Sequence, residues 1–133
     1  MAQEIKINID KGHSNNDTVC FNVKNCTKQD IWFYTHGLLA RLYLKDANGM
    51  RVLPTRKSEA DPINIPKYVL IEADSVKKIC IPIGKILLNF DLLKDEKYYL
   101  FFEYENLRKK PKSKIKTYRG KIEIQSLEIQ ILK

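Results

Sequence analysis

The sequence has few of the residues from which common catalytic and cofactor sites are built. It contains five glycines and two histidines among 133 residues, and these form no Gly-rich phosphate loop, no HExxH helix and no serine elbow. We expect His13 and His36 to be loop or surface residues. Glu103 and Glu105 lie two positions apart on one expected strand, where a solvated face explains a pair of carboxylates. The sequence therefore predicts a protein that is not an enzyme and needs no cofactor or metal.

Long apolar runs are also missing. No stretch approaches the roughly 20 consecutive apolar residues that a transmembrane helix needs, and the segment Met1 to Glu4 lacks the apolar run that begins a signal peptide. We therefore expect no membrane span. The expected compartment is the cytoplasm if Met1 is the natural start and the periplasm if a leader has been removed.

Cysteine is scarce and irregularly placed. Cys20, Cys26 and Cys80 are an odd number, and their spacings match no zinc pattern and no dense disulfide framework. We expect free thiols that pack as small apolar side chains.

What the sequence does contain is a succession of short strands. Apolar residues make up 44% and charged residues 30% of the chain, which is typical of one folded domain covering residues 1–133. β-Branched and aromatic runs are separated by turn residues about every ten positions, without long helical periodicity, and this pattern predicts an all-β antiparallel sandwich of two sheets. The expected strands are 4–9, 18–24, 31–35, 41–45, 50–53, 68–71, 76–81, 98–104 and 121–132, the last broken near Ser126.

The apolar pattern within these runs distinguishes two kinds of strand. Residues 5–9, 19–23 and 79–83 alternate between apolar and other residues, as half-buried strands do. Residues 31–34 and 98–102 are apolar in both phases, which is typical of central strands or of a face covered by another segment. Between strands, Asn48-Gly49 predicts a hairpin turn, and the apolar spacing of residues 86–93 predicts a short helical crossover.

Five short pieces share a further pattern. They are residues 23–31, in which Asn25 opens a turn; Trp32; residues 71–82, a polar turn before an alternating strand that ends in Pro82; residues 95–99, with tyrosine near a strand start; and residues 118–126. This set resembles the immunoglobulin-like β-sandwiches of small bacterial exported, immunity and inhibitor proteins, including intracellular proteinase inhibitors.

The resemblance implies three structural features and no active site. Trp32 would be buried between the sheets, and a tyrosine of residues 95–99 would bond back to the chain just upstream. An inter-sheet disulfide is not implied, because Phe101 stands where antibody-type domains place their second cysteine and Cys20 is out of phase with the core. Since second and fifth strands pair in such sandwiches, Cys20 and Cys80 would be neighbours on one outward face, bonded or not.

The positive charge is concentrated in one segment. The formal net charge is +8, and residues 108–119 hold seven basic residues and no acid, whereas the rest of the chain has 17 basic against 16 acidic residues. With Pro111 inside it and few apolar anchors, we expect a mobile loop between the last two strands. The candidate contact residues are Arg108, Lys109, Lys110, Lys112, Lys114, Lys116, Tyr118 and Arg119, and the resemblance adds Lys24 and Lys28 at the same end of the sandwich.

Three functions are compatible with this pattern. The first is a non-catalytic protein-binding module of immunity or inhibitor type that neutralises an acidic toxin or enzyme, with the loop raising the encounter rate. The second is a nucleic-acid-binding module in which Tyr104 or Tyr118 stacks on bases. The third is a structural or adhesive domain of the cell envelope, in which the loop only aids solubility.

Overall fold

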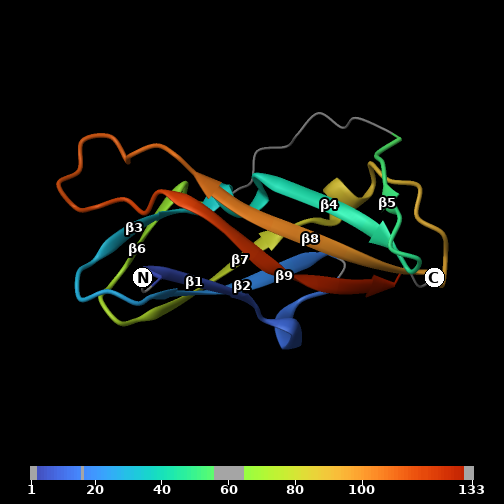
Figure 1. The fold of residues 1–133 in the computed structure, drawn as a ribbon, viewed down its shortest axis with the longest axis horizontal. Helices are drawn as coiled ribbons and strands as arrows, with labels where there is room; N and C mark the ends of the chain where they lie inside the picture. Colours follow the sequence, from blue (N-terminus) through green and yellow to red (C-terminus); the bar gives the residue numbers. More distant parts are fainter. Residues whose placement is uncertain (1–2, 16, 56–64, 131–133) are drawn as a thin grey trace.

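The computed structural model describes residues 3–15, 17–55 and 65–130, and these form nine antiparallel strands and three short helices (Figure 1). The strands are β1 Ile5–Ile9, β2 Thr18–Asn25, β3 Ile31–Tyr34, β4 Arg41–Asp46, β5 Arg51–Val52, β6 Tyr68–Ile71, β7 Val76–Pro82, β8 Lys97–Asn106 and β9 Gly120–Gln130. The helices are η1 Lys11–His13, η2 Thr35–Leu39 and α1 Gly84–Leu87. The all-β antiparallel prediction is confirmed, as is a short helix between β7 and β8. The helices in the described part of the chain are too short and too polar to span a bilayer.

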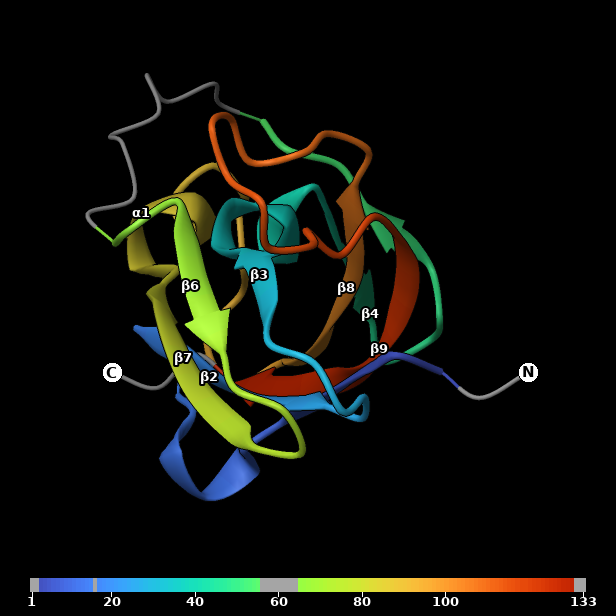
Figure 2. The same cartoon turned by 90° about the vertical axis from the view of Figure 1, so that its left-hand side faces the viewer.

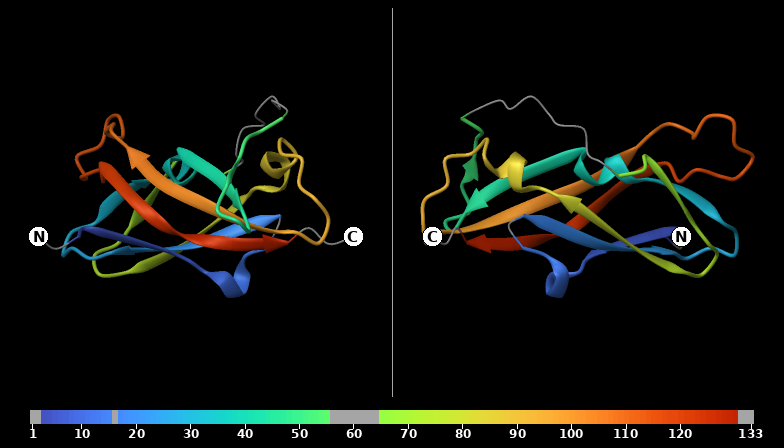
Figure 3. Two further views of the ribbon diagram at one scale, coloured as in Figure 1. Left: turned by 45° about the vertical axis from the view of Figure 1, so that its right-hand side comes forward. Right: turned by 180° about the vertical axis from the view of Figure 1, so that it is seen from behind.

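The strands form two larger sheets and one small pair. One sheet has the order β1-β2-β7, the second has the order β5-β4-β8-β9, and β3 pairs with β6 alone. Figures 1 and 3 show the two larger sheets facing one another, with β3 and β6 at the end of the molecule that also carries the connection between β8 and β9. This small pair is therefore the part of the fold nearest to the basic segment.

The core lies between the sheets and follows from the alternation of apolar residues. β1 buries Ile5, Ile7 and Ile9, and β8 buries every second residue from Tyr98 to Tyr104. Phe21 of β2 meets Phe102 of β8 edge to face, with 5.3 Å between ring centroids. Aromatic pairs of this geometry add stability beyond their buried area.

The prediction that Trp32 is buried between the sheets is wrong. On β3 the fully buried residues are Ile31 and Phe33, so Trp32 and Tyr34 point to the opposite face and are only half-buried. Phe33 takes the core position and stacks on Tyr104, with 4.7 Å between ring centroids. Because adjacent residues of a strand face opposite sides, a strand this short can bury only one of these two large rings in the core.

The expected break near Ser126 is a bulge within one continuous strand. Leu100 pairs with Leu127 and Phe102 pairs with Ile124, so one residue of β8 lies opposite two residues of β9. An extra residue of this kind shifts the alternation by one position. It allows Ile122 and Ile124 before the bulge, and Leu127 and Ile129 after it, to face the same core.

Several expected turns form as local hydrogen bonds. The Tyr98 hydroxyl accepts a hydrogen bond from the Leu93 amide at 2.8 Å, which is the upstream bond implied by the tyrosine pattern. Asn25 is fully buried, and its Nδ2 donates to the carbonyl oxygens of Gln29 and Ile71. This side chain fixes the β2–β3 turn against the end of β6. The turn between β4 and β5 contains Gly49 with φ of 81°, as the Asn-Gly sequence predicts.

Cys20 and Cys80 are directly opposite one another on β2 and β7 and form a disulfide. Their predicted neighbourhood is confirmed, while the expectation of free thiols is wrong for these two and right for Cys26. The bond joins neighbouring strands of one sheet and does not link the two sheets. The spacing of the cysteines does not predict this disulfide, because a bond between two strands depends on their register and not on a sequence motif.

We expect the double substitution Cys20→Ala with Cys80→Ala to lower the free energy of unfolding by up to about 4 kcal/mol, because the disulfide closes a chain segment with a sequence separation of 60. Urea unfolding of the oxidised protein and the variant measures the difference. Cys26→Ser is the matched control and should change stability little. Equal unfolding midpoints for the double variant and the oxidised wild type would contradict the expected contribution.

Gly37 of η2 packs closely against β8, and we expect Gly37→Ala to lower the free energy of unfolding by about 2 kcal/mol. A Cβ atom there would lie 2.7 Å from the Glu105 carbonyl oxygen and 2.7 Å from the Tyr104 ring. At Gly12 the nearest atom to such a Cβ is 3.6 Å away, so Gly12→Ala is the control and should change stability little. Similar thermal midpoints for the two variants would show that η2 is not tightly packed on β8.

Candidate binding surface

Residues 108–119, called the basic loop below, fold back along the outer edge of β3. The Trp32 amide donates to the Lys116 carbonyl oxygen at 2.8 Å, and the Tyr118 amide donates to the Trp32 carbonyl oxygen at 2.9 Å. These bonds make a short parallel bridge between Trp32 and Thr117. Figure 2 shows the loop running beside β3 at this end of the molecule. The returning half of the loop therefore extends the small β3–β6 pair.

The Trp32 side chain holds the other half of the loop. Its Nε1 donates to the Ser113 hydroxyl at 2.8 Å, and the Lys110 ammonium lies 4.9 Å from the centre of the indole ring. A cation at this distance is attracted by the face of the ring. Residues 31–34 are thus apolar in both phases because one face packs in the core and the other is covered by this loop.

Buried polar side chains fix the base of the loop. Asn106 is 6% exposed and donates from Nδ2 to the carbonyl oxygens of Arg108 and Tyr118, each at 3.0 Å. Thr117, also buried, accepts from the Lys110 amide through its hydroxyl at 2.9 Å. Apolar anchors are few in the loop, as expected, since Ile115 is 38% exposed, but polar groups hold the loop in their place. The anchors are backbone groups and small polar residues, which an apolar pattern does not reveal.

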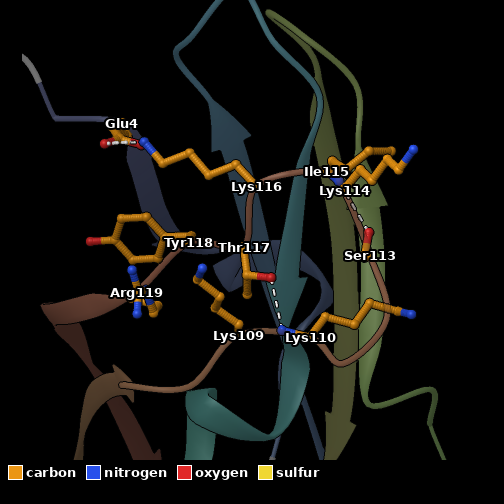
Figure 4. A pocket seen from close by; sticks show the side chains of 10 residues that line it. All are labelled: Glu4, Lys109, Lys110, Ser113, Lys114, Ile115, Lys116, Thr117, Tyr118 and Arg119. Atoms are coloured by element: carbon orange, nitrogen blue, oxygen red, sulfur yellow. Dashed lines mark hydrogen bonds and ion pairs between the residues drawn. The ribbon is translucent and has the colours of Figure 1, made fainter.

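The loop encloses a cavity of about 430 Å³ whose lining is strongly basic (Figure 4). It is lined by Glu4, Lys109, Lys110, Ser113, Lys114, Ile115, Lys116, Thr117, Tyr118 and Arg119. Lys116 forms an ion pair with Glu4 at 2.7 Å. The other four cations of the lining form no ion pair with a carboxylate of the described residues. The surface thus offers several positive charges that no carboxylate of the described residues neutralises.

Figure 4 shows how these side chains divide between two sides of the loop. Lys116 extends to Glu4 on the side where Tyr118, Arg119 and Lys109 lie, whereas Lys110 extends to the opposite side. Tyr118 is half-buried, and burial together with the nearby Glu4 carboxylate raises the pKa of its hydroxyl. Tyr118 therefore stays neutral at physiological pH and provides a hydroxyl and a ring edge rather than a charge.

The structure brings together most of the predicted contact residues, but not all of them. Arg108 lies outside the cavity, next to Tyr34 and Tyr68. Lys112 adopts a positive φ of 58° and is exposed. Lys24 lies on the outward face of the three-stranded sheet, opposite Lys6 of β1, and Lys28 lies in the β2–β3 turn. Neither Lys24 nor Lys28 lines the cavity, because strand pairing directs Lys24 to a different surface.

Two contributors were missed by the sequence analysis. Glu4 pairs with the loop from a position far away in the chain, and Trp32 was assigned to the core. One feature of the sequence does favour Phe33 over Trp32 as the core ring. Ile31 is two positions from Phe33, so the two residues face the same side of the strand.

Glu105 and Tyr104, which suggested other chemistry, make structural contacts. Glu105 pairs with Arg41 at 3.4 Å and with Lys121 at 3.8 Å. Tyr104 is fully buried, and its burial raises the pKa of the hydroxyl; it cannot stack on a nucleic-acid base. Within residues 3–15, 17–55 and 65–130, no group of three or more His, Cys, Asp or Glu side chains is placed to hold a metal ion.

The contrast between Trp32 and Phe33 gives a direct test of how the loop is held. We expect Phe33→Ala to lower the free energy of unfolding by about 3 to 5 kcal/mol, as core aromatic truncations do. Trp32→Ala should cost only about 1 to 2 kcal/mol, because its ring is half-exposed, yet it should release the loop. Amide hydrogen exchange measures this release at Lys110 and Ile115, whose amides bond to loop hydroxyls. Unchanged exchange at these amides in Trp32→Ala would show that the indole does not hold the loop.

Comparison of the sequence with known protein families finds no match, and no curated protein is significantly similar to it. A function must therefore be inferred from the geometry and charge of the surface described above.

Proposed function

We propose that this protein is a non-catalytic binding module of immunity or inhibitor type, whose basic loop contacts an acidic surface of a toxin or enzyme. The observation that carries the proposal is the combination of unneutralised cations and firm anchorage in one loop. The cations Lys109, Lys110, Lys114 and Arg119 surround a cavity that is fixed to β3 by the Trp32 bonds. A fixed loop loses little conformational freedom on binding, which favours affinity.

The clustered positive charge of the basic loop supports a protein partner that is attracted electrostatically. Clustered positive charge raises the rate of encounter with an acidic surface more than it raises final affinity. The same cations would also attract nucleic acid, which is the second candidate function. Less supports that candidate, because Tyr104 is buried and the Trp32 ring already carries Lys110 on one face. Base stacking normally needs open aromatic faces.

The disulfide supports an oxidising compartment for this function. Bonds of the Cys20–Cys80 kind persist in secreted and periplasmic proteins and are rare in the cytosol of most organisms. We therefore infer that the proposed binding takes place in the periplasm or outside the cell.

The test replaces Lys109, Lys110, Lys112 and Lys114 by Ser. Stability should fall by at most about 1 kcal/mol, because Lys109, Lys112 and Lys114 are exposed and the partly buried Lys110 loses only its contact with the Trp32 ring. Association with the partner should slow by about tenfold at low salt and lose most of its salt dependence. The partner is first captured at low salt and released at high salt, and the association rate is then measured by surface plasmon resonance.

The matched control replaces four exposed lysines elsewhere, Lys6, Lys11, Lys77 and Lys94, by Ser. It removes the same net charge but should leave the association rate much closer to that of the wild type. If both quadruple variants bind the partner with the same rate and salt slope, the loop only aids solubility. If the captured material is nucleic acid of any sequence, with affinity that falls steeply with salt, the second candidate function replaces the first.

A further inference from the structure

A second cavity, of about 710 Å³, lies beside the first residues of the basic loop. Its lining includes Tyr34 of β3, Tyr68 of β6, Leu107 just before the loop and Pro111 within it. We call this cavity the tyrosine groove. It differs from the first cavity in having two tyrosines and fewer cations, three against five.

The apolar part of the tyrosine groove is accessible. Tyr34 and Tyr68 are opposite each other in the β3–β6 pair, both half-buried, with 5.3 Å between their ring centroids. Leu107 is 63% exposed. A single exposed leucine is common on protein surfaces, but here it lines the same cavity as two tyrosines. Exposed apolar groups rimmed by charge are typical of interaction sites.

The charged part of the groove has cations available for a ligand. Lys67 and Arg108 line it and are exposed, and neither forms an ion pair with a carboxylate of the described residues. Arg41, by contrast, is paired with Glu105. The groove therefore combines an apolar floor with two cations that pair with no carboxylate in the part of the chain that the structure describes.

We propose that the tyrosine groove binds an acidic peptide segment of the partner that carries one aromatic or aliphatic side chain. That side chain packs on Tyr34, Tyr68 and Leu107, while neighbouring carboxylates pair with Lys67 and Arg108. Tyrosine and arginine are enriched among the residues that dominate interface energy, and such residues tend to pair with the anchoring residues of the partner. This inference rests on the proposed function, and it assigns the anchoring contact to the groove and the steering charge to the basic loop.

One feature favours a peptide over a nucleic acid as the occupant. The rings of Tyr34 and Tyr68 are tilted by 47° to one another, and Lys110 lies 6.0 Å from the centre of the Tyr68 ring. This arrangement provides a pocket for one side chain rather than a row of open faces for successive bases.

The experiment compares three fluorescent probes by anisotropy: a short polyglutamate peptide with one central phenylalanine, the same peptide with alanine there, and an oligothymidine of similar charge. The phenylalanine peptide should bind the wild type about tenfold more tightly than the alanine peptide. Leu107→Ala should remove most of that difference. Leu88→Ala is the matched control, because Leu88 is 67% exposed next to α1, and it should preserve the difference.

The outcomes separate this inference from the proposed function. Equal binding of the two peptides, equal effects of Leu107→Ala and Leu88→Ala, or no binding of the phenylalanine peptide would each overturn the groove inference. None of these outcomes would contradict the proposed function, in which a protein partner binds to the basic loop in a salt-sensitive way. Tighter binding of oligothymidine than of either peptide would instead count against the proposed function as well as the groove. The variant with four serines in the loop should weaken both peptides while keeping their ratio.

Discussion

The pairing of the basic loop with β3 is the constraint on which this end of the molecule depends. β3 has four residues and one strand partner, β6, and an isolated pair of short strands is marginally stable. The Trp32 backbone groups bond to Lys116 and Tyr118 and so give β3 a neighbour on its second edge. The same bonds hold a chain segment that carries seven positive charges in one conformation, although like charges repel. The hydrogen bonds that complete the pairing of β3 are therefore the same bonds that hold the positive charges of the basic loop in place.

That constraint explains why Trp32 faces outward. A loop with many lysines cannot pack into a core, but the long side chain of Lys110 can lie over an indole ring while its ammonium stays near water. Phe33, which has no polar atom in its side chain, fills the dry side of the same strand. The two neighbouring aromatic residues are thus suited to two environments, one apolar and one partly solvated.

The sequence predicts the strands well because local chemistry determines them. Alternating apolar residues and turn residues located all nine strands, and Asn48-Gly49 located a hairpin. What could not be predicted depends on contacts between distant parts of the chain. The Cys20–Cys80 bond depends on the register of β2 with β7, and the Trp32–Ser113 bond joins residues 81 positions apart. The candidate site was predicted in composition from its charge, but not in its anchorage or in the role of Glu4.

The first cavity and the tyrosine groove differ in the distance over which they can act on a partner. Cations around the first cavity act over distances comparable to the Debye length, about 8 to 10 Å at physiological salt, and so affect the approach of a partner. The apolar floor of the tyrosine groove could act only in contact, where excluding water would slow the dissociation of a bound partner. A partner that meets both surfaces would arrive quickly because of charge and leave slowly because of its apolar anchor. Because the basic loop is bonded to β3, which also carries Tyr34 of the groove, the two surfaces keep a fixed relation to one another.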